Sequence, residues 1–103
     1  MATVTPTIEV HGSSVLVSWL GLSAGDVGAE VDVSQFNTIS TQNDVALQMC
    51  NDPANQPWIG VVPSGWSGGA SSSQGKITDR FRFIRPNTNG STSGDVTLWC
   101  VNL

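Results

Sequence analysis

The chain has 103 residues, with eight Asp and Glu, four Lys and Arg and one His, and its formal net charge is −4. A chain of this length is expected to form one domain, residues 1–103, around a single core. The balance is negative and all four cations fall within residues 76–85, which argues against binding nucleic acid by neutralising phosphates. No stretch reaches the ~18 apolar residues of a membrane helix, and the first residues lack the basic and apolar regions of an export signal. We therefore expect neither a nucleic acid nor a membrane as a partner.

The residue content favours strands over helices along the whole chain. Val, Ile and Thr supply 26 residues, which pack well on a pleated surface, whereas Lys and Glu together supply three. Apolar residues alternate with polar ones between turn signals, which is typical of half-buried strands. This pattern predicts an all-β chain with strands over Thr3–Val10, Ser13–Leu20, Gly28–Val33, Phe36–Thr41, Asp44–Cys50, Pro57–Val62, Lys76–Arg85 and Asp95–Leu103.

The first two strands are separated by His11 and Gly12, which predicts a tight turn and a β-hairpin. The buried face of this hairpin is predicted to carry Ile8, Val10, Val15, Val17 and Trp19. Pro6 has no N–H to donate, so the first strand either lies at the edge of a sheet or begins after Pro6. In the second case residues 1–6 form an extended N-terminal arm.

Long connections rich in Gly, Ser and Asn separate the later strands. Residues 22–28, 65–75 and 87–94 contain residues that tolerate positive φ or bond their own backbone, which predicts loops. Trp66 is the only large side chain of the second loop.

The sequence proposes no catalytic or metal-binding constellation. His11 is the only imidazole and precedes a glycine in a predicted turn, and the carboxylates occur one at a time, mostly beside turns. A nucleophile, a base and a group that orients the base cannot be named. We expect a protein that is not an enzyme and that holds no cofactor or metal.

Cys50 and Cys100 each lie in a predicted strand. Val96, Leu98 and Cys100 share one face of the last strand, whereas Cys50 lies on the face opposite that of Leu47. If both apolar faces point inward, the two sulfur atoms point in opposite directions. We therefore expect two reduced thiols rather than a disulfide.

Four Trp residues occur without a single Tyr. Trp19 and Trp99 alternate with polar residues and are predicted to be buried or half-buried, whereas Trp66 stands in a Gly/Ser loop. An exposed Trp in such a loop favours a contact with another protein, and a sugar-stacking surface is the alternative.

Residues 79–86 alternate Phe81 and Phe83 with Arg80 and Arg82. A strand with this pattern is predicted to cover the core with its phenyl rings and to present guanidinium groups on the other face. These groups are either solvated or paired with carboxylates of a neighbouring subunit, because Arg forms bidentate pairs and is enriched at interfaces.

The order of three segments resembles that of small virion proteins of tailed bacteriophages. The segments are Trp19–Val33, with the pattern W-x-x-L-x-x-G-D-x-G-x-x-V, then Val45–Trp58, and finally Phe83–Pro86 followed by Asp95–Leu98. The second segment departs from the pattern at Cys50 and Pro53, where small residues and Gly are usual. Each motif is short, so the resemblance depends on their common order over residues 19–103.

Members of this group with an associated role resemble capsid decoration (cement) proteins, which are small β-sandwiches, often trimeric, on the outer face of a capsid. The resemblance implies a single antiparallel β-sandwich of jelly-roll or immunoglobulin-like topology. It also implies a homotrimer whose partner is the major capsid protein, located on the capsid surface of the virion and made in the host cytoplasm.

The expected function is therefore stabilisation of the mature phage head by binding its outer surface. A tail, fibre or neck component and a carbohydrate-binding module remain alternatives. The candidate contacts with a subunit or the capsid are Trp66, Arg80, Arg82, Thr3, Val4 and Thr5.

Overall fold

The computed structural model describes residues 2–42, 47–61, 74–77, 81–87 and 94–101, which form strands and turns without a helix. The strands are β1 (Thr3–Val4), β2 (Thr7–His11), β3 (Ser14–Leu22), β4 (Val27–Gly28), β5 (Val31–Asp32), β6 (Thr38–Gln42), β7 (Leu47–Cys50), β8 (Ile59–Val61), β9 (Gln74–Ile77), β10 (Phe83–Pro86) and β11 (Gly94–Val101). All described strand pairs are antiparallel except the short parallel pair of β1 and β4.

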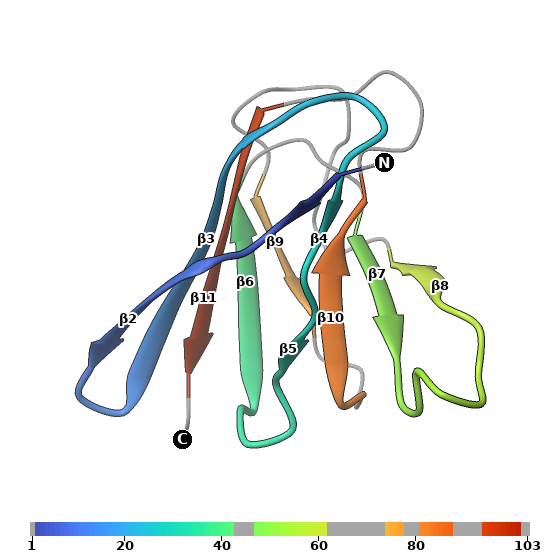
Figure 1. The fold of residues 1–103 in the computed structure, drawn as a ribbon. Coiled ribbons are helices and arrows are strands. Elements are labelled where there is room, and N and C mark those ends of the chain that lie inside the picture. The colour runs from blue at the N-terminus through green and yellow to red at the C-terminus, as the bar shows by residue number, and fades with distance from the viewer. Residues whose placement is uncertain (1, 43–46, 62–73, 78–80, 88–93, 102–103) are drawn as a thin grey trace.

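The strands form a five-stranded sheet of order β2-β3-β11-β6-β9 and a four-stranded sheet of order β5-β10-β7-β8 (Figure 1). With β2 left aside, the pairing is nested: β3 pairs with β11, β5 with β10, β6 with β9 and β7 with β8. Nested antiparallel pairs divided between two sheets are the jelly roll. The prediction of an antiparallel β-sandwich is confirmed, and its topology is the jelly roll rather than the immunoglobulin-like arrangement.

One hydrophobic cluster joins the two sheets. The five-stranded sheet contributes Val17, Trp19, Leu22, Val96, Leu98, Cys100, Ile39 and Ile77. The four-stranded sheet and the residues beside it contribute Leu47, Ile84, Val33 and Phe81. Burial of these apolar side chains is the main favourable term for a fold that has few charges.

The predicted hairpin of β2 and β3 is confirmed, with Gly12 in the turn at a φ of 62°. The prediction that Ile8 and Val10 are buried is wrong, because both side chains are exposed. The physical reason lies in the topology: β2 is an additional strand at the edge of the five-stranded sheet, and Ile8 and Val10 lie outside the hydrophobic cluster that joins the two sheets in the described part of the chain.

A bulge in β3 changes which residues face the core. Val96 pairs with Trp19 while Gly94 pairs with Leu22, so β3 carries one extra residue at this point. Gly21 has a φ of 70°, and its N–H donates to Oδ1 of Asp95 at 2.8 Å. As a result Leu22 returns to the core and Leu20 is left exposed.

Several predicted elements differ from the structure. The predicted strand Lys76–Arg85 is two strands, β9 and β10, which belong to different sheets. The predicted strand Thr3–Val10 is divided into β1 and β2, and Gly28–Val33 is divided between the end of β4 and β5. The predicted loops 22–28 and 65–75 end in strands, because Val27 and Gly28 pair with β1 and β9 begins at Gln74. The divided strands and the shortened loops follow from long-range pairing that alternation within a segment does not report.

Pro6 separates β1 from β2, and β2 lies at a sheet edge. Both observations agree with the prediction made from the missing N–H of Pro6. The first residues are held by their own chain: the Val27 N–H donates to the Ala2 carbonyl and the Ala29 N–H to the Val4 carbonyl, both at 2.9 Å. The backbone of residues 2–4 is thus engaged within the same molecule.

Candidate functional site

Four of the six nominated contact residues fall within the described part of the chain. Arg82 immediately precedes β10 and is exposed. Thr3 and Val4 form β1, while Thr5 follows it; Thr3 and Thr5 are exposed and Val4 is half-buried. The structure does not bring Arg82 together with the N-terminal residues in any described contact. Trp66 and Arg80 lie outside the described residues.

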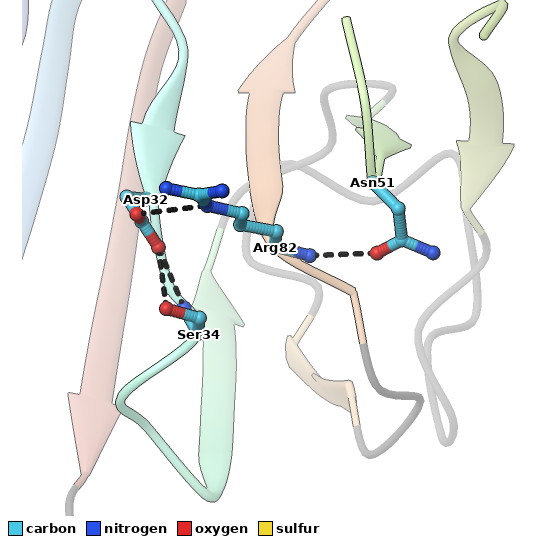
Figure 2. A network of polar contacts seen from close by, with 4 residues as sticks. All are labelled: Asp32, Ser34, Asn51 and Arg82. Atoms are coloured by element: carbon cyan, nitrogen blue, oxygen red, sulfur yellow. Dashed lines mark hydrogen bonds and ion pairs between the residues drawn. The ribbon is translucent and has the colours of Figure 1, made fainter.

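Arg82 is the centre of a polar network on the four-stranded sheet, shown in Figure 2. Its Nε donates to Oδ2 of Asp32 in β5 at 3.2 Å. Its backbone N–H donates to Oδ1 of Asn51, at the end of β7, at 2.9 Å. Both oxygens of Asp32 are used, since Oδ1 accepts from the Ser34 hydroxyl at 2.7 Å and from the Ser34 N–H at 3.0 Å. Arg82 is therefore bound by two segments distant in sequence, since Asp32 accepts from its guanidinium group and Asn51 accepts from its backbone.

The guanidinium of Arg82 also lies over the ring of Phe83, with its Cζ 4.9 Å from the ring centroid. The prediction that Phe83 covers the core together with Phe81 is wrong in part, because Phe81 is buried whereas Phe83 is only half-buried. Phe83 pairs with Asp32 and Cys50, and the next residue, Ile84, supplies the core contact. The alternation therefore restarts at β10, where Ile84 and Pro86 are buried and Phe83 and Arg85 are half-buried.

A second arginine stacks on the same face of the sheet. Arg85 is two residues after Phe83, so both project from the outer face of β10. The Cζ of Arg85 lies 4.0 Å from the ring centroid of Trp58, and its Nε donates to Oε1 of Gln48 at 3.1 Å. Cation–π contacts of this kind hold the planar group in place while its outer N–H donors remain at the surface.

The outer face of the four-stranded sheet thus carries a cluster that we name the arginine face. It consists of Asp32, Gln48, Trp58, Arg82, Phe83 and Arg85. The sequence singled out only Arg82 of these six as a contact residue. Arg85 was missed because the alternation of Phe and Arg residues ends before it. Gln48 was missed because its pairing with Arg85 depends on the register of two strands distant in sequence.

The Asp32 carboxyl has a pKa below its ordinary value of 3.8. The largest cause is the hydrogen bond from the Ser34 hydroxyl, followed by that from the Ser34 N–H, with a smaller contribution from Arg82. Because the folded pKa is depressed, the interaction stabilises the fold above pH 3.8 and is lost as the pH falls through the folded pKa. The pair is largely exposed, so solvent screens it.

We expect Ser34→Ala to raise the pKa of Asp32 toward 3.8, because the substitution removes the strongest hydrogen bond to the ionised carboxylate. Arg82→Gln should also raise it, because the substitution removes a hydrogen bond and a positive charge. Carbon-13 NMR titration of the Asp32 carboxyl measures both shifts in the folded protein. An unchanged Asp32 pKa in Ser34→Ala would contradict the assignment of its depression to the Ser34 hydroxyl.

Both cysteines are free thiols in buried positions. Cys100 lies in the core cluster, and burial raises its pKa to about 11. Cys50 lies opposite Phe83, and its Sγ is 3.5 Å from the carbonyl oxygen of Gln56. The opposite orientation predicted for the two sulfur atoms is confirmed, since Cys100 belongs to the core cluster, whereas Cys50 pairs with Phe83 on the face of the sheet opposite to the buried Ile84.

The described ranges of the chain contain neither a candidate metal site nor a candidate membrane helix. These residues contain no group of three or more His, Cys, Asp or Glu side chains that could hold a metal ion. The same part of the chain holds no helix long and apolar enough to cross a membrane.

Comparison with known proteins identifies the fold. No protein-family model matches the chain, and no curated protein matches its sequence. A cupin domain from Bordetella pertussis Tohama I superposes with a TM-score of 0.53 at 10% identity, covering 97% of this chain and 93% of that one. A protein from Neisseria meningitidis gives a TM-score of 0.47 at 7% identity, over 93% and 82% of the two chains. At this identity the cupin likeness shows the jelly-roll fold and carries no function.

Proposed function

We propose that this chain is a non-enzymatic decoration protein that binds the outer surface of a tailed-phage capsid and stabilises the mature head. The arginine face is the observation that supports the proposal, together with the motif order described above. In a chain of net charge −4, it gathers two guanidinium groups on one sheet. Arginine and aromatic side chains are enriched in protein interfaces, and guanidinium forks suit carboxylates of a partner subunit.

The proposed mechanism is binding to one state of the shell. A protein that contacts the expanded lattice better than the unexpanded one stabilises the expanded lattice by the difference in binding free energy. Because many copies bind one shell, a modest difference per site is multiplied. The proposed partner is the major capsid protein, and the proposed location is the capsid surface of the virion after synthesis in the host cytoplasm.

We expect Arg82→Ala to weaken capsid binding by about 5- to 30-fold, which corresponds to about 1–2 kcal/mol for one interface arginine. Co-sedimentation with mature capsids measures the affinity. Arg82→Lys should recover part of the loss, because it keeps the charge and loses the planar fork. Ser18→Ala, on the other sheet, serves as the matched control. Equal binding of Arg82→Ala and the parent chain would remove Arg82 from the contact.

Cryo-electron microscopy of capsids incubated with the chain tests the function itself. Density at local three-fold or quasi-three-fold positions of the shell is the expected result. Density confined to the tail axis would replace decoration by a tail, fibre or neck role. If no particle binds the chain and its tryptophan fluorescence responds to glycans, the carbohydrate-binding alternative replaces both.

A further inference from the structure

The edge strand β2 exposes every one of its side chains. Ile8 is 56% exposed and Val10 is 73% exposed. Ile8 pairs with Val17 and Val10 pairs with Val15, and directly opposed residues of an antiparallel pair share a face of the sheet. Since Val17 belongs to the core, Ile8 and Val10 extend the core face beyond the part that the second sheet covers.

The backbone of β2 presents a free edge as well. Gly12 and Ser13 form a two-residue turn, so His11 and Ser14 are the pair that exchanges the first hydrogen bonds of the hairpin. Hydrogen-bonded and non-hydrogen-bonded pairs alternate along an antiparallel ladder, which makes the next hydrogen-bonded positions Glu9 and Thr7. The N–H and C=O groups of Ile8 and Val10 therefore point away from β3. No described strand pairs with that side of β2.

An edge with free backbone groups and uncovered apolar side chains is a template for another strand. We propose that β2 pairs antiparallel with β2 of a second copy of this chain, about a two-fold axis at Val10. The two five-stranded sheets then become continuous. Val10 meets Val10 of the second copy on the core face, and their outward N–H and C=O groups form the central hydrogen-bonded pair.

Side-chain contacts across the seam favour this register over its neighbours. With the axis at Val10, each Glu9 lies opposite His11 of the second copy, on the face where the Glu9 carboxylate and the His11 ring already approach to 3.4 Å within one chain. An axis at Glu9 would place the two Glu9 carboxylates directly opposite each other, which is destabilising. An axis at Ile8 would bring Pro6, which has no N–H, into the ladder.

The first test measures mass in solution. Light scattering after size-exclusion chromatography should give twice the 10.8 kDa of one chain, and Val10→Lys should shift the mass toward one chain. In the paired arrangement the two substituted side chains lie directly opposite each other across the seam, and like charges in that position are destabilising. Leu20→Lys is the matched control, because Leu20 is 60% exposed but lies on β3, away from the edge. A monomeric parent chain, or a Val10→Lys variant of unchanged mass, overturns the proposal.

The second test fixes the register. Val10→Cys should form a disulfide-linked dimer when diamide oxidises the two thiols, because a hydrogen-bonded antiparallel pair places its Cα atoms about 5.5 Å apart. Ile8→Cys should not crosslink, since four residues of offset separate the two positions by about 13 Å. The native thiols are buried and give little background. Crosslinking through Ile8→Cys instead of Val10→Cys overturns the Val10 axis.

A third test of the register uses substitutions at Glu9 and His11, first singly and then combined. Glu9→Lys alone should weaken the dimer, because it removes the carboxylate that faces His11 of the second copy. Glu9→Lys combined with His11→Glu should restore the dimer, because it again places opposite charges across the seam. Failure of the double variant to recover the dimer would contradict the assigned register.

This inference is independent of the proposed function, and it differs from the trimer implied by the resemblance. A two-fold contact uses the same patch on both copies and closes at two, whereas a closed trimer needs a head-to-tail contact. A mass of three chains would therefore overturn the β2 pairing and leave capsid decoration in place. A dimer that binds no capsid would support the β2 pairing and overturn the proposal of capsid decoration.

Discussion

Leu98→Ala is expected to lower the free energy of unfolding by about 2–5 kcal/mol, the range for removing a buried leucine side chain. Leu98 is 0% exposed in β11, the central strand of the five-stranded sheet. It lies opposite Val17 on one side and Thr41 on the other, and both are buried. The close packing around Leu98 leaves little room for neighbouring side chains to fill the cavity.

Urea unfolding of the parent chain and the variant measures this loss. For a domain whose total stability is about 5–15 kcal/mol, the expected loss is a large fraction of the total. Leu20→Ala makes the same chemical change at an exposed site and should stay within about 0.5 kcal/mol of the parent chain. A similar loss at both positions would contradict the arrangement in which the β3 bulge turns Leu20 outward.

Gly28→Ala is expected to cost about 1–3 kcal/mol, because a side chain at this position has no space. A Cβ built on Gly28 collides with the Pro86 ring and comes within 2.8 Å of Nε1 of Trp19. Trp19 and Pro86 are themselves fully buried, so neither can move aside without disturbing the core. Gly28 is thus required where β4 packs closely against β3 and β10.

The change in Tm and in the urea midpoint measures this effect, with Gly60→Ala as the control. Gly60 also lies in a strand, but a Cβ at that position meets nothing within 4 Å. We expect Gly60→Ala to change stability by less than about 0.5 kcal/mol. If Gly28→Ala were as mild as Gly60→Ala, the close approach of Pro86 to β4 would be wrong.

Local features of the fold could be predicted from the sequence because they depend on neighbouring residues. The Gly12 turn needs a residue that tolerates positive φ, and Pro6 excludes a hydrogen-bonded position in a ladder. Alternation along the last strand correctly predicted which residues of β11 face the core. The same alternation failed across residues 76–85, where one apolar pattern spans two strands of different sheets.

The candidate site was predicted only at Arg82. Alternation placed its guanidinium outside the core, but its partners Asp32 and Asn51 come from 50 and 31 residues away in the sequence. The stacking of Arg85 on Trp58 depends on the pairing of β10 with β7 and of β7 with β8. No signal within either segment reports that register.

By itself the sequence determined the β character of the chain, the positions of its tightest turn and of its ladder-breaking proline, and the opposite orientation of its two thiols. These properties follow from φ preferences, missing donors and the two-residue period of a strand. Only the tertiary structure decided the jelly-roll order, the formation of the arginine face and the exposure of Ile8 and Val10. The physical reason is that burial of a strand face depends on whether a second layer packs over it, and the side chains of β2 lie outside the cluster that joins the two sheets.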